Sequence, residues 1–302
     1  EIRTFTEHKM REYFAEHGFI EIHSPKLTSQ CSEGGAEVFA VDYYGSKAYL
    51  TQSPQFYKQM AIASGFEKVF EFGPYYRAEN SRHAAESYCV DFEVADIKSH
   101  HEIADIEEDW IIYVLKAIKE KYGEVIEKVF GEKVMLPTDK IPRLKLSEVF
   151  EIFEKVYGIK TPEAKQLDLD PEAEKLICDY AKDYLGSELV FITDYPAEAR
   201  AFYTKKSDEN PLESMSLDLL YRGWEMNSGA MRENDFAKLK AQIEEKGINS
   251  TKMQGYLQFF EYGCPPHGGI GFGIDRFIAK LLGLSSIKDS IFIFRGPSKI
   301  TP

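Results

Sequence analysis

The spacing of apolar residues along the chain changes between two periods, and this predicts a mixture of helices and strands. Apolar residues recur at helical spacing in three segments of the first half, at 4–17, 54–64 and 101–121. Short apolar or alternating runs bounded by turn residues predict strands at 19–22, 38–44, 47–51, 69–78 and 88–97. Because only a short polar segment separates 69–78 from 88–97, we expect these two strands to pair antiparallel.

The segment 123–190 has a different texture from the rest of the chain. It is rich in Lys and Glu and carries helical patterns near 146–157 and 172–184, so we expect a peripheral helical insertion there. The remaining pattern predicts strands at 189–193, 200–203, 214–221 and 224–231 and helices at 234–246 and 250–262. Because the strands come in adjacent runs rather than in strict βαβ alternation, the predicted fold class is α+β, an antiparallel sheet flanked by helices.

Composition and charge exclude several classes of protein. Of the 302 residues 43% are hydrophobic, enough for a substantial core, and no apolar run approaches the about 18 residues of a membrane helix. The N-terminus lacks a signal-peptide pattern, and the four cysteines form no CxxC pair, which favours a reduced, cytoplasmic setting without structural zinc. A net charge of -13 argues against binding nucleic acid through bulk charge.

The stretch from Gly268 to Arg276 alternates glycine with apolar residues and then enters an apolar helix. A glycine face would let a flat ligand lie against the strand, and the planar fork of Arg276 suits a phosphate or a carboxylate. The alternative is a strand packed tightly on another backbone, with Arg276 in a structural ion pair. The chain contains no GxxxxGK[ST] sequence, so this is not a P-loop.

Two further segments carry candidate chemistry. Arg77 ends a predicted strand, and Arg82 and His83 follow on the connecting loop, an arrangement suited to a polyphosphate. Asp218 and Glu225 flank a predicted hairpin turn, where they could share a divalent ion with a phosphate chain. In each case the alternative is a set of ordinary surface charges, which contribute little.

Taken in this order, the three segments resemble the catalytic domain of class II aminoacyl-tRNA synthetases, in the aspartyl/asparaginyl branch and closest to the aspartyl enzymes. The segment around Pro25 is similar to motif 1, the Arg77 hairpin to motif 2 and residues 271–276 to motif 3, and Glu33-Gly-Gly and Gln52-Ser-Pro-Gln55 also match. The resemblance implies one catalytic domain over 1–302 and a homodimer formed through motif 1. We expect the anticodon-binding OB-fold that family members carry ahead of motif 1 to be absent from this chain.

The resemblance implies ATP and Mg²⁺ as cofactors, and L-aspartate and a tRNA as substrates, with the asparagine tRNA as an additional candidate. It implies catalytic roles for Arg77 and Arg276. It implies ATP-binding roles for Arg77, Glu79, His83, Glu225, Gly273 and Arg276. It implies aspartate-binding roles for Glu33, Gln55, Lys58, Asp91, Ser228 and Arg232, and metal-binding roles for Asp218 and Glu225. Where family members carry an aromatic residue against adenine this chain has Ser87, which leaves Tyr88 or Phe272 as candidates.

The expected choice of aspartate rests on Lys58 and Arg232, which match the family positions that hold the substrate's side-chain carboxylate. An asparagine site would have no reason to aim two cations at a neutral amide, because burying them unpaired is costly. Two alternatives stay open at this point: an asparaginyl-tRNA synthetase, and a stand-alone paralogue that gives the aspartyl-adenylate to ammonia. A non-catalytic homologue is disfavoured because the apparent ATP, metal and carboxylate ligands are all present.

Overall fold

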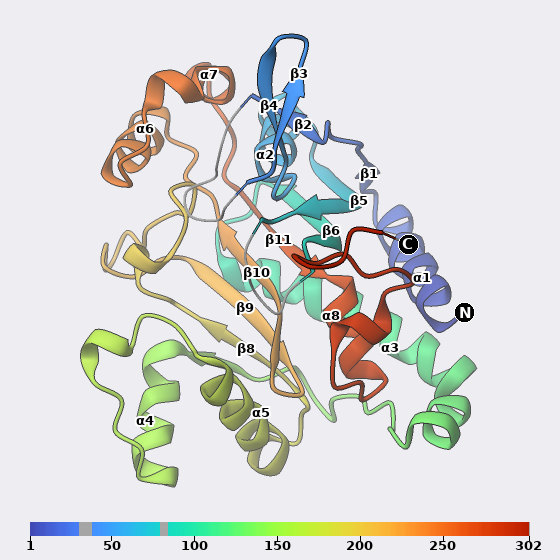
Figure 1. The fold of residues 1–302 in the computed structure, drawn as a ribbon. Coiled ribbons are helices and arrows are strands. Elements are labelled where there is room, and N and C mark those ends of the chain that lie inside the picture. Colours follow the sequence, from blue (N-terminus) through green and yellow to red (C-terminus); the bar gives the residue numbers. More distant parts are fainter. Residues whose placement is uncertain (30–37, 79–83, 302) are drawn as a thin grey trace.

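The computed structural model describes residues 1–29, 38–78 and 84–301, and its centre is a mixed β-sheet (Figure 1). In spatial order the strands of this sheet are β1 (Ile20–Glu21), β5 (Lys68–Tyr76), β6 (Glu86–Ala95), β11 (His267–Gly273), β10 (Trp224–Met231), β9 (Ser216–Tyr221), β8 (Leu189–Thr193) and β7 (Arg143–Lys145). The pairs from β5 across to β8 are antiparallel, whereas β1 and β7 join the two edges in parallel. The predicted α+β class with an antiparallel sheet is confirmed.

The helices of the described residues flank this sheet. They are α1 (Ile2–Glu16), α2 (Gln55–Ala63), α3 (His100–Phe130), α4 (Leu146–Tyr157), α5 (Pro171–Leu185), α6 (Phe236–Glu245), α7 (Gln254–Glu261) and α8 (Ile274–Leu281). Short 3₁₀ turns lie at Glu163–Lys165, Ala197–Ala199, Ser250–Met253 and Ile287–Ser290. A small second sheet has the order β2 (Leu27–Thr28), β4 (Ser46–Leu50) and β3 (Ala40–Tyr43). None of the described helices is long and apolar enough to cross a bilayer.

Alternation along β6 gives this part of the sheet one apolar face and one polar face. On the apolar face, Phe14 of α1 stacks on Phe70 of β5 with ring centroids 4.8 Å apart, and Trp110 of α3 meets Phe272 of β11 edge-on at 5.0 Å. Successive side chains of a strand point to opposite faces. Asp91 and Glu93 of β6 therefore lie on the face opposite Phe92, where the site described below is built.

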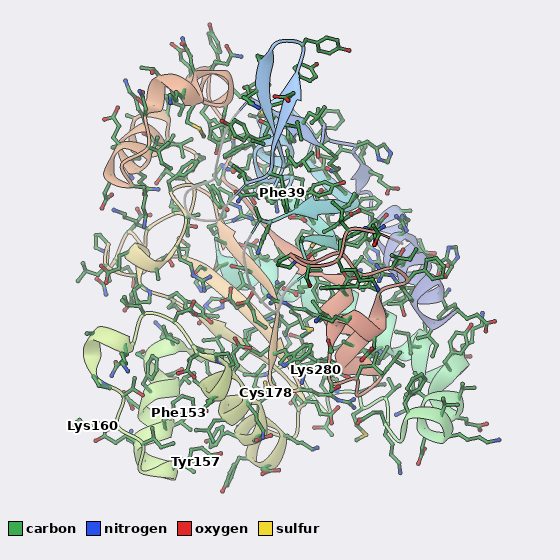
Figure 2. All side chains as sticks on the ribbon, in the orientation of Figure 1. Phe39, Phe153, Tyr157, Lys160, Cys178 and Lys280 are labelled. Carbon is green, nitrogen blue, oxygen red and sulfur yellow. The ribbon has the colours of Figure 1, made fainter. Side chains whose placement is uncertain are left out.

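Residues 123–190 contribute more than helices. The sequence predicts an end of this helix near 121, but α3 continues through Gly123 because Ile126 is still buried in the core. The helix ends at Phe130 and is capped by Gly131, whose φ of 75° favours glycine. Phe153 of α4 and Cys178 of α5 pack in a second apolar cluster beside β8 (Figure 2). Strand β7, which the pattern did not predict, joins the main sheet. That this segment is an insertion stays a prediction.

The strand predicted at 200–203 is wrong. Those residues form a bend and a turn, and the neighbouring Thr204 makes only an isolated bridge to Arg232. Two side chains explain the difference: Arg200 turns toward Asp218, and Phe202 is buried in the apolar cluster formed with α6 and α7. Their directions are set by tertiary contacts that no local pattern reveals.

Candidate active site

A pocket opens on the polar face of the sheet, between the β5–β6 hairpin and the start of α8. It is lined by residues that include Arg77, Tyr88, Glu225, Ser228, Gly271, Gly273 and Arg276. Arg77 directly follows β5, and Arg276 lies in the first turn of α8. The structure thus brings the two arginines predicted as catalytic to one pocket, together with the hairpin β9–β10 that carries Glu225.

The glycines of β11 allow the close approach of a neighbouring strand, and two of them line the pocket. A Cβ at Gly269 would lie 1.9 Å from the carbonyl oxygen of Phe92, so this glycine is required by the close approach of β6. Gly271 lines the pocket, and a Cβ there would lie 2.8 Å from Asp91 Oδ1. Gly271 therefore leaves open the space between the pocket and Asp91.

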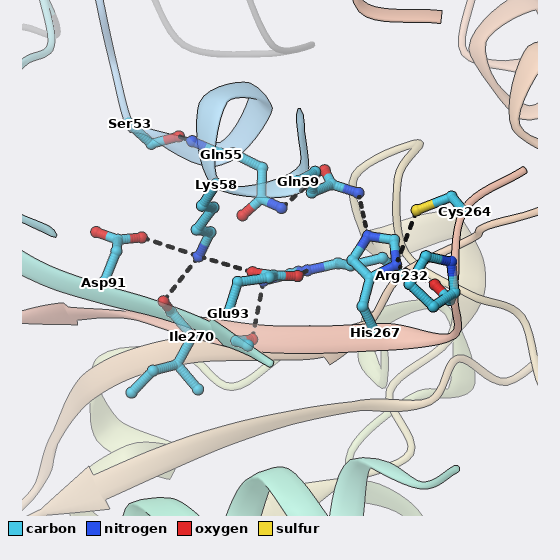
Figure 3. A network of polar contacts seen from close by, with 12 residues as sticks. Ser53, Gln55, Lys58, Gln59, Asp91, Glu93, Arg232, Cys264, His267 and Ile270 are labelled. Carbon is cyan, nitrogen blue, oxygen red and sulfur yellow. Dashed lines mark hydrogen bonds and ion pairs between the residues drawn. The ribbon is translucent and has the colours of Figure 1, made fainter. Parts of the chain in front are cut away.

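Lys58 of α2 and Arg232, which follows β10, meet two carboxylates of β6 in a buried layer beside the pocket (Figure 3). Lys58 Nζ lies 3.0 Å from Asp91 Oδ1 and 3.2 Å from Glu93 Oε2, and it donates to the carbonyl oxygen of Ile270 at 2.8 Å. Arg232 contacts both oxygens of Glu93, through Nε at 2.8 Å and Nη2 at 3.3 Å. The two cations predicted to bind a substrate carboxylate do lie together, but each already has a carboxylate partner.

The pKa values in this layer follow from burial and from these pairs. Burial raises the pKa of Asp91 above its ordinary value, and the nearby Lys58 only partly opposes this. Burial also disfavours the Glu93 carboxylate, but Arg232 and then Lys58 outweigh it, so the pKa of Glu93 is lowered. The formal charges of the four groups cancel, and Asp91 is the carboxylate that is less firmly held in its ionised form.

Asp218 and Glu225 lie near each other, although they do not pair across the β9–β10 hairpin, where Asp218 faces Ser228. Burial, followed by the charge of Asp218, raises the pKa of Glu225 to about 7. Arg276 donates to the backbone oxygen of Glu225 at 2.8 Å and lies 3.5 Å from its Oε1. Among the described residues, Asp218 Oδ1 is buried without a hydrogen-bond partner.

These two carboxylates fit a magnesium ion that is held jointly with a phosphate chain. A cation placed between the two side chains would give Asp218 Oδ1 a partner and would stabilise the ionised form of Glu225, whose pKa is raised. Within residues 1–29, 38–78 and 84–301, no group of three or more His, Cys, Asp or Glu side chains could hold a metal on its own. Mg²⁺ is commonly bound by one or two carboxylates plus substrate phosphates, so two ligands suffice here.

Arg200 is a site residue that sequence reasoning missed. Its Nη2 donates to Asp218 Oδ2 at 2.7 Å and its Nη1 donates to Ser228 Oγ at 3.0 Å, while the guanidinium lies 3.7 Å from the centroid of the Tyr195 ring. Arg200 therefore links a predicted metal ligand to a predicted aspartate-pocket residue. No motif in the neighbouring sequence identifies Arg200 as a site residue. The strand predicted at 200–203 also gave no reason to place Arg200 beside Asp218.

Some predicted site residues are not placed. Glu33, Glu79 and His83 lie outside the described residues, as does Arg82. Of the two aromatic candidates for adenine, Phe272 is fully buried against α3 and is excluded, whereas Tyr88 lines the pocket.

Comparison with known proteins gives a consistent result. The family model for tRNA synthetases class II (D, K and N) matches residues 1–294. The chain is 40% identical over 295 residues to the aspartate–tRNA(Asp/Asn) ligase of Aeropyrum pernix, covering 97% of this chain and 66% of that protein. It is 40% identical over 304 residues to the aspartate–tRNA(Asp) ligase of Pyrococcus abyssi, covering 100% and 68%. The chain thus spans about two thirds of the length of these relatives.

Solved structures of both branches share the fold. The asparaginyl-tRNA synthetase of Pyrococcus horikoshii in complex with asparaginyl-adenylate superposes with a TM-score of 0.90 at 28% identity, covering 100% of this chain and 69% of that one. The aspartyl-tRNA synthetase of Entamoeba histolytica superposes with a TM-score of 0.87 at 29% identity, covering 100% and 59%. The likeness in fold therefore does not separate aspartate from asparagine.

Proposed function

Because this chain belongs to the class II tRNA synthetases of the D, K and N group, we propose that it activates L-aspartate with ATP and transfers it to a tRNA. The observation that carries the proposal is the buried layer of Lys58, Arg232, Asp91 and Glu93 next to a pocket that holds Arg77 and Arg276. One part of the site has cations for a second carboxylate, and the adjoining part has cations for phosphates.

In the proposed reaction the α-carboxylate of aspartate attacks the α-phosphorus of ATP, an aspartyl-adenylate forms and pyrophosphate leaves. A hydroxyl of the tRNA's terminal ribose then attacks the activated carbonyl, and AMP leaves. The attacking carboxylate is already ionised, so no general base is required in the first step. Arg77 stabilises charge that develops on the α-phosphate, and Arg276 holds the far end of the phosphate chain. Asp218 and Glu225 would hold Mg²⁺, which neutralises phosphate charge when bound.

Selectivity for aspartate follows from an exchange of ion pairs. The substrate's ammonium group pairs with Asp91, which releases Lys58 from that partner. Lys58 and Arg232 then share the substrate's side-chain carboxylate, and each charge keeps a counter-charge. Asparagine also supplies the ammonium group but leaves Lys58 facing a neutral amide, and a buried cation that loses a partner is costly.

Asparagine remains the second candidate, and one observation favours it. Glu93 pairs with Arg232 at 2.8 Å, so Arg232 does not require a substrate carboxylate as its counter-charge. Some relatives are named as ligases for both the aspartate and the asparagine tRNA, and we propose no choice between these tRNAs.

Assembly and location are also proposals. A homodimer through the segment around Pro25 agrees with the half-exposed apolar side chains of Ile20 and Leu27 on either side of it. A cytoplasmic location agrees with the name of the rat relative, a cytoplasmic aspartate–tRNA ligase.

ATP–pyrophosphate exchange tests the proposed activation step. We expect exchange that depends on aspartate and magnesium, and a loss of at least about a hundredfold in kcat for Arg77→Ala, because this arginine acts on the transition state. Arg143→Ala is the control, since Arg143 lies on β7 at the far edge of the sheet and pairs there with Asp105 and Glu108 of α3. No aspartate-dependent exchange by the unaltered protein would overturn the proposal.

A further inference from the structure

A series of hydrogen bonds between buried amides and one imidazole leads from the buried layer around Lys58 into the protein (Figure 3). Gln55 Nε2 donates to Gln59 Oε1 at 2.8 Å, and Tyr256 Oη donates to the same oxygen at 3.1 Å. Gln59 Nε2 lies 3.2 Å from His267 Nε2, and His267 Nδ1 lies 2.9 Å from the carbonyl oxygen of Pro265. Both glutamines and His267 are buried.

The residues at the inner end of this series of hydrogen bonds determine which group donates and which accepts in each bond. His267 Nδ1 has two neighbours, the carbonyl oxygen of Pro265 at 2.9 Å and the more distant Sγ of Cys264 at 3.6 Å. Because the nearer one, a carbonyl oxygen, can only accept a hydrogen bond, we assign the proton to His267 Nδ1. Burial lowers the pKa of His267, so the ring is neutral and its Nε2 is an acceptor. Gln59 must therefore present its amino group to His267 and its carbonyl oxygen to Gln55.

The same logic continues to the substrate side. Because Gln59 offers Gln55 an acceptor, Gln55 uses its amino group inward and turns its carbonyl oxygen to the side of Lys58 and the site. A carbonyl oxygen accepts from an ammonium group, whereas an amide nitrogen would present two donors to it. One backbone carbonyl, three hydrogen bonds away, thus decides whether Gln55 attracts or repels a substrate ammonium.

We infer that Gln59 and His267 are positioning residues, which hold the Gln55 amide with its oxygen toward the α-ammonium group of the amino acid. The inference rests on the proposed function, since it takes an amino acid as the ligand of this layer. It assigns no contact with substrate to Gln59 or His267 themselves. Their effect on the substrate passes through Gln55.

Two substitutions at one position separate direction from packing. Gln59→Glu still gives Gln55 a hydrogen-bond acceptor in either protonation state. A carboxylic acid at this position donates to His267 Nε2 and accepts from Gln55. A carboxylate beside a protonated His267 ring also accepts from Gln55. Gln59→Met keeps the length of the side chain but offers Gln55 no acceptor. We expect Gln59→Met to raise the aspartate KM in pyrophosphate exchange about tenfold, as for loss of a hydrogen bond to a charged group, and Gln59→Glu to change it by less than about threefold.

The kcat and the KM for ATP should stay within about twofold of the unaltered values in both variants, because neither change reaches the phosphate pocket. Equal shifts in aspartate KM for the two variants, or no shift in either, would overturn the inference. An ATP KM that rises together with the aspartate KM would do the same, since it would indicate general loss of structure.

The tautomer of His267 is a second readout that does not depend on activity. Nitrogen-15 NMR of the full chain with labelled histidine should show His267 as a neutral ring protonated on Nδ1, with the signal identified by its loss in His267→Phe. A ring protonated on Nε2 would refute the proposed positioning role of His267 even if aspartate-dependent exchange is normal. If the unaltered protein shows no aspartate-dependent exchange, the proposed function fails, and the tautomer of His267 alone tests the orientation of these hydrogen bonds.

Discussion

Lys58→Met removes the ammonium group that Asp91 and Glu93 share, and it leaves the packing volume of the side chain nearly unchanged. Glu93 keeps its two contacts with Arg232, at 2.8 and 3.3 Å. Asp91 loses the cation at 3.0 Å, and burial already raises its pKa. The main consequence should therefore be a buried aspartate without a counter-charge, for which the usual cost is about 3–5 kcal/mol.

Protonation sets an upper limit on this cost. At pH 7, neutralising a carboxyl with a reference pKa of 3.8 costs about 1.36 × (7 − 3.8), or about 4.4 kcal/mol, and at pH 5 it costs only about 1.6 kcal/mol. The folded state of the variant holds the proton on Asp91 more tightly than the unfolded state does, so its stability falls as pH rises. We expect a loss in unfolding free energy of about 3–4 kcal/mol at pH 7 and about 1.5 kcal/mol at pH 5.

Urea unfolding of the unaltered protein and the variant at both pH values measures this difference. Lys155→Met is the matched control, because Lys155 lies 2.8 Å from Glu151 on the exposed side of α4 and should give no measurable change at either pH. A deficit that is the same at pH 5 and pH 7, or one below about 1 kcal/mol at pH 7, would refute the reasoning about Asp91.

Two further predictions concern the metal ligands and the glycine strand. Since the pKa of Glu225 is raised to about 7 by burial and then by Asp218, the binding of Mg–ATP should strengthen as pH rises from about 6 to 8. In calorimetry, the Glu225→Gln variant should bind Mg–ATP more weakly, and its affinity should no longer depend on pH in this range. A dependence on magnesium that is unchanged in the variant would show that Glu225 is not a metal ligand. Gly269→Ala should lower the thermal midpoint sharply or prevent folding, because its Cβ would lie 1.9 Å from a backbone oxygen. Gly255→Ala, with nothing within 4 Å of its Cβ, should raise the midpoint slightly, and a similar effect of the two changes would contradict the packing argument.

The sequence predicts the elements that local pattern controls. The paired strands β5 and β6, the hairpin β9–β10 and the passage from β11 into α8 all lie where the alternation and the turn residues indicate. The prediction fails where tertiary contacts override local signals. Gly123 continues a helix because Ile126, almost one turn further on, is still buried in the core. Residues 200–203 leave the strand conformation because Arg200 and Phe202 have distant partners.

The candidate site shows the same division. Lys58 and Arg232 could be selected from the sequence because they match family positions, and the structure places them together. Their carboxylate partner Glu93 was not selected, although the alternation Asp91-Phe92-Glu93 places it on the same strand face as Asp91. Gln59 and His267 could not be selected, because their role depends on which atoms accept hydrogen bonds in the folded chain.

The exchange of ion pairs at Lys58 is the central claim, and the ratio of kcat/KM for aspartate to that for asparagine in ATP–pyrophosphate exchange tests it most directly. We expect a ratio well above one for the unaltered protein, and a ratio that falls toward one in Lys58→Met, because the cation that would bind the substrate's side-chain carboxylate is then missing. Equal or better activation of asparagine by the unaltered protein would contradict it.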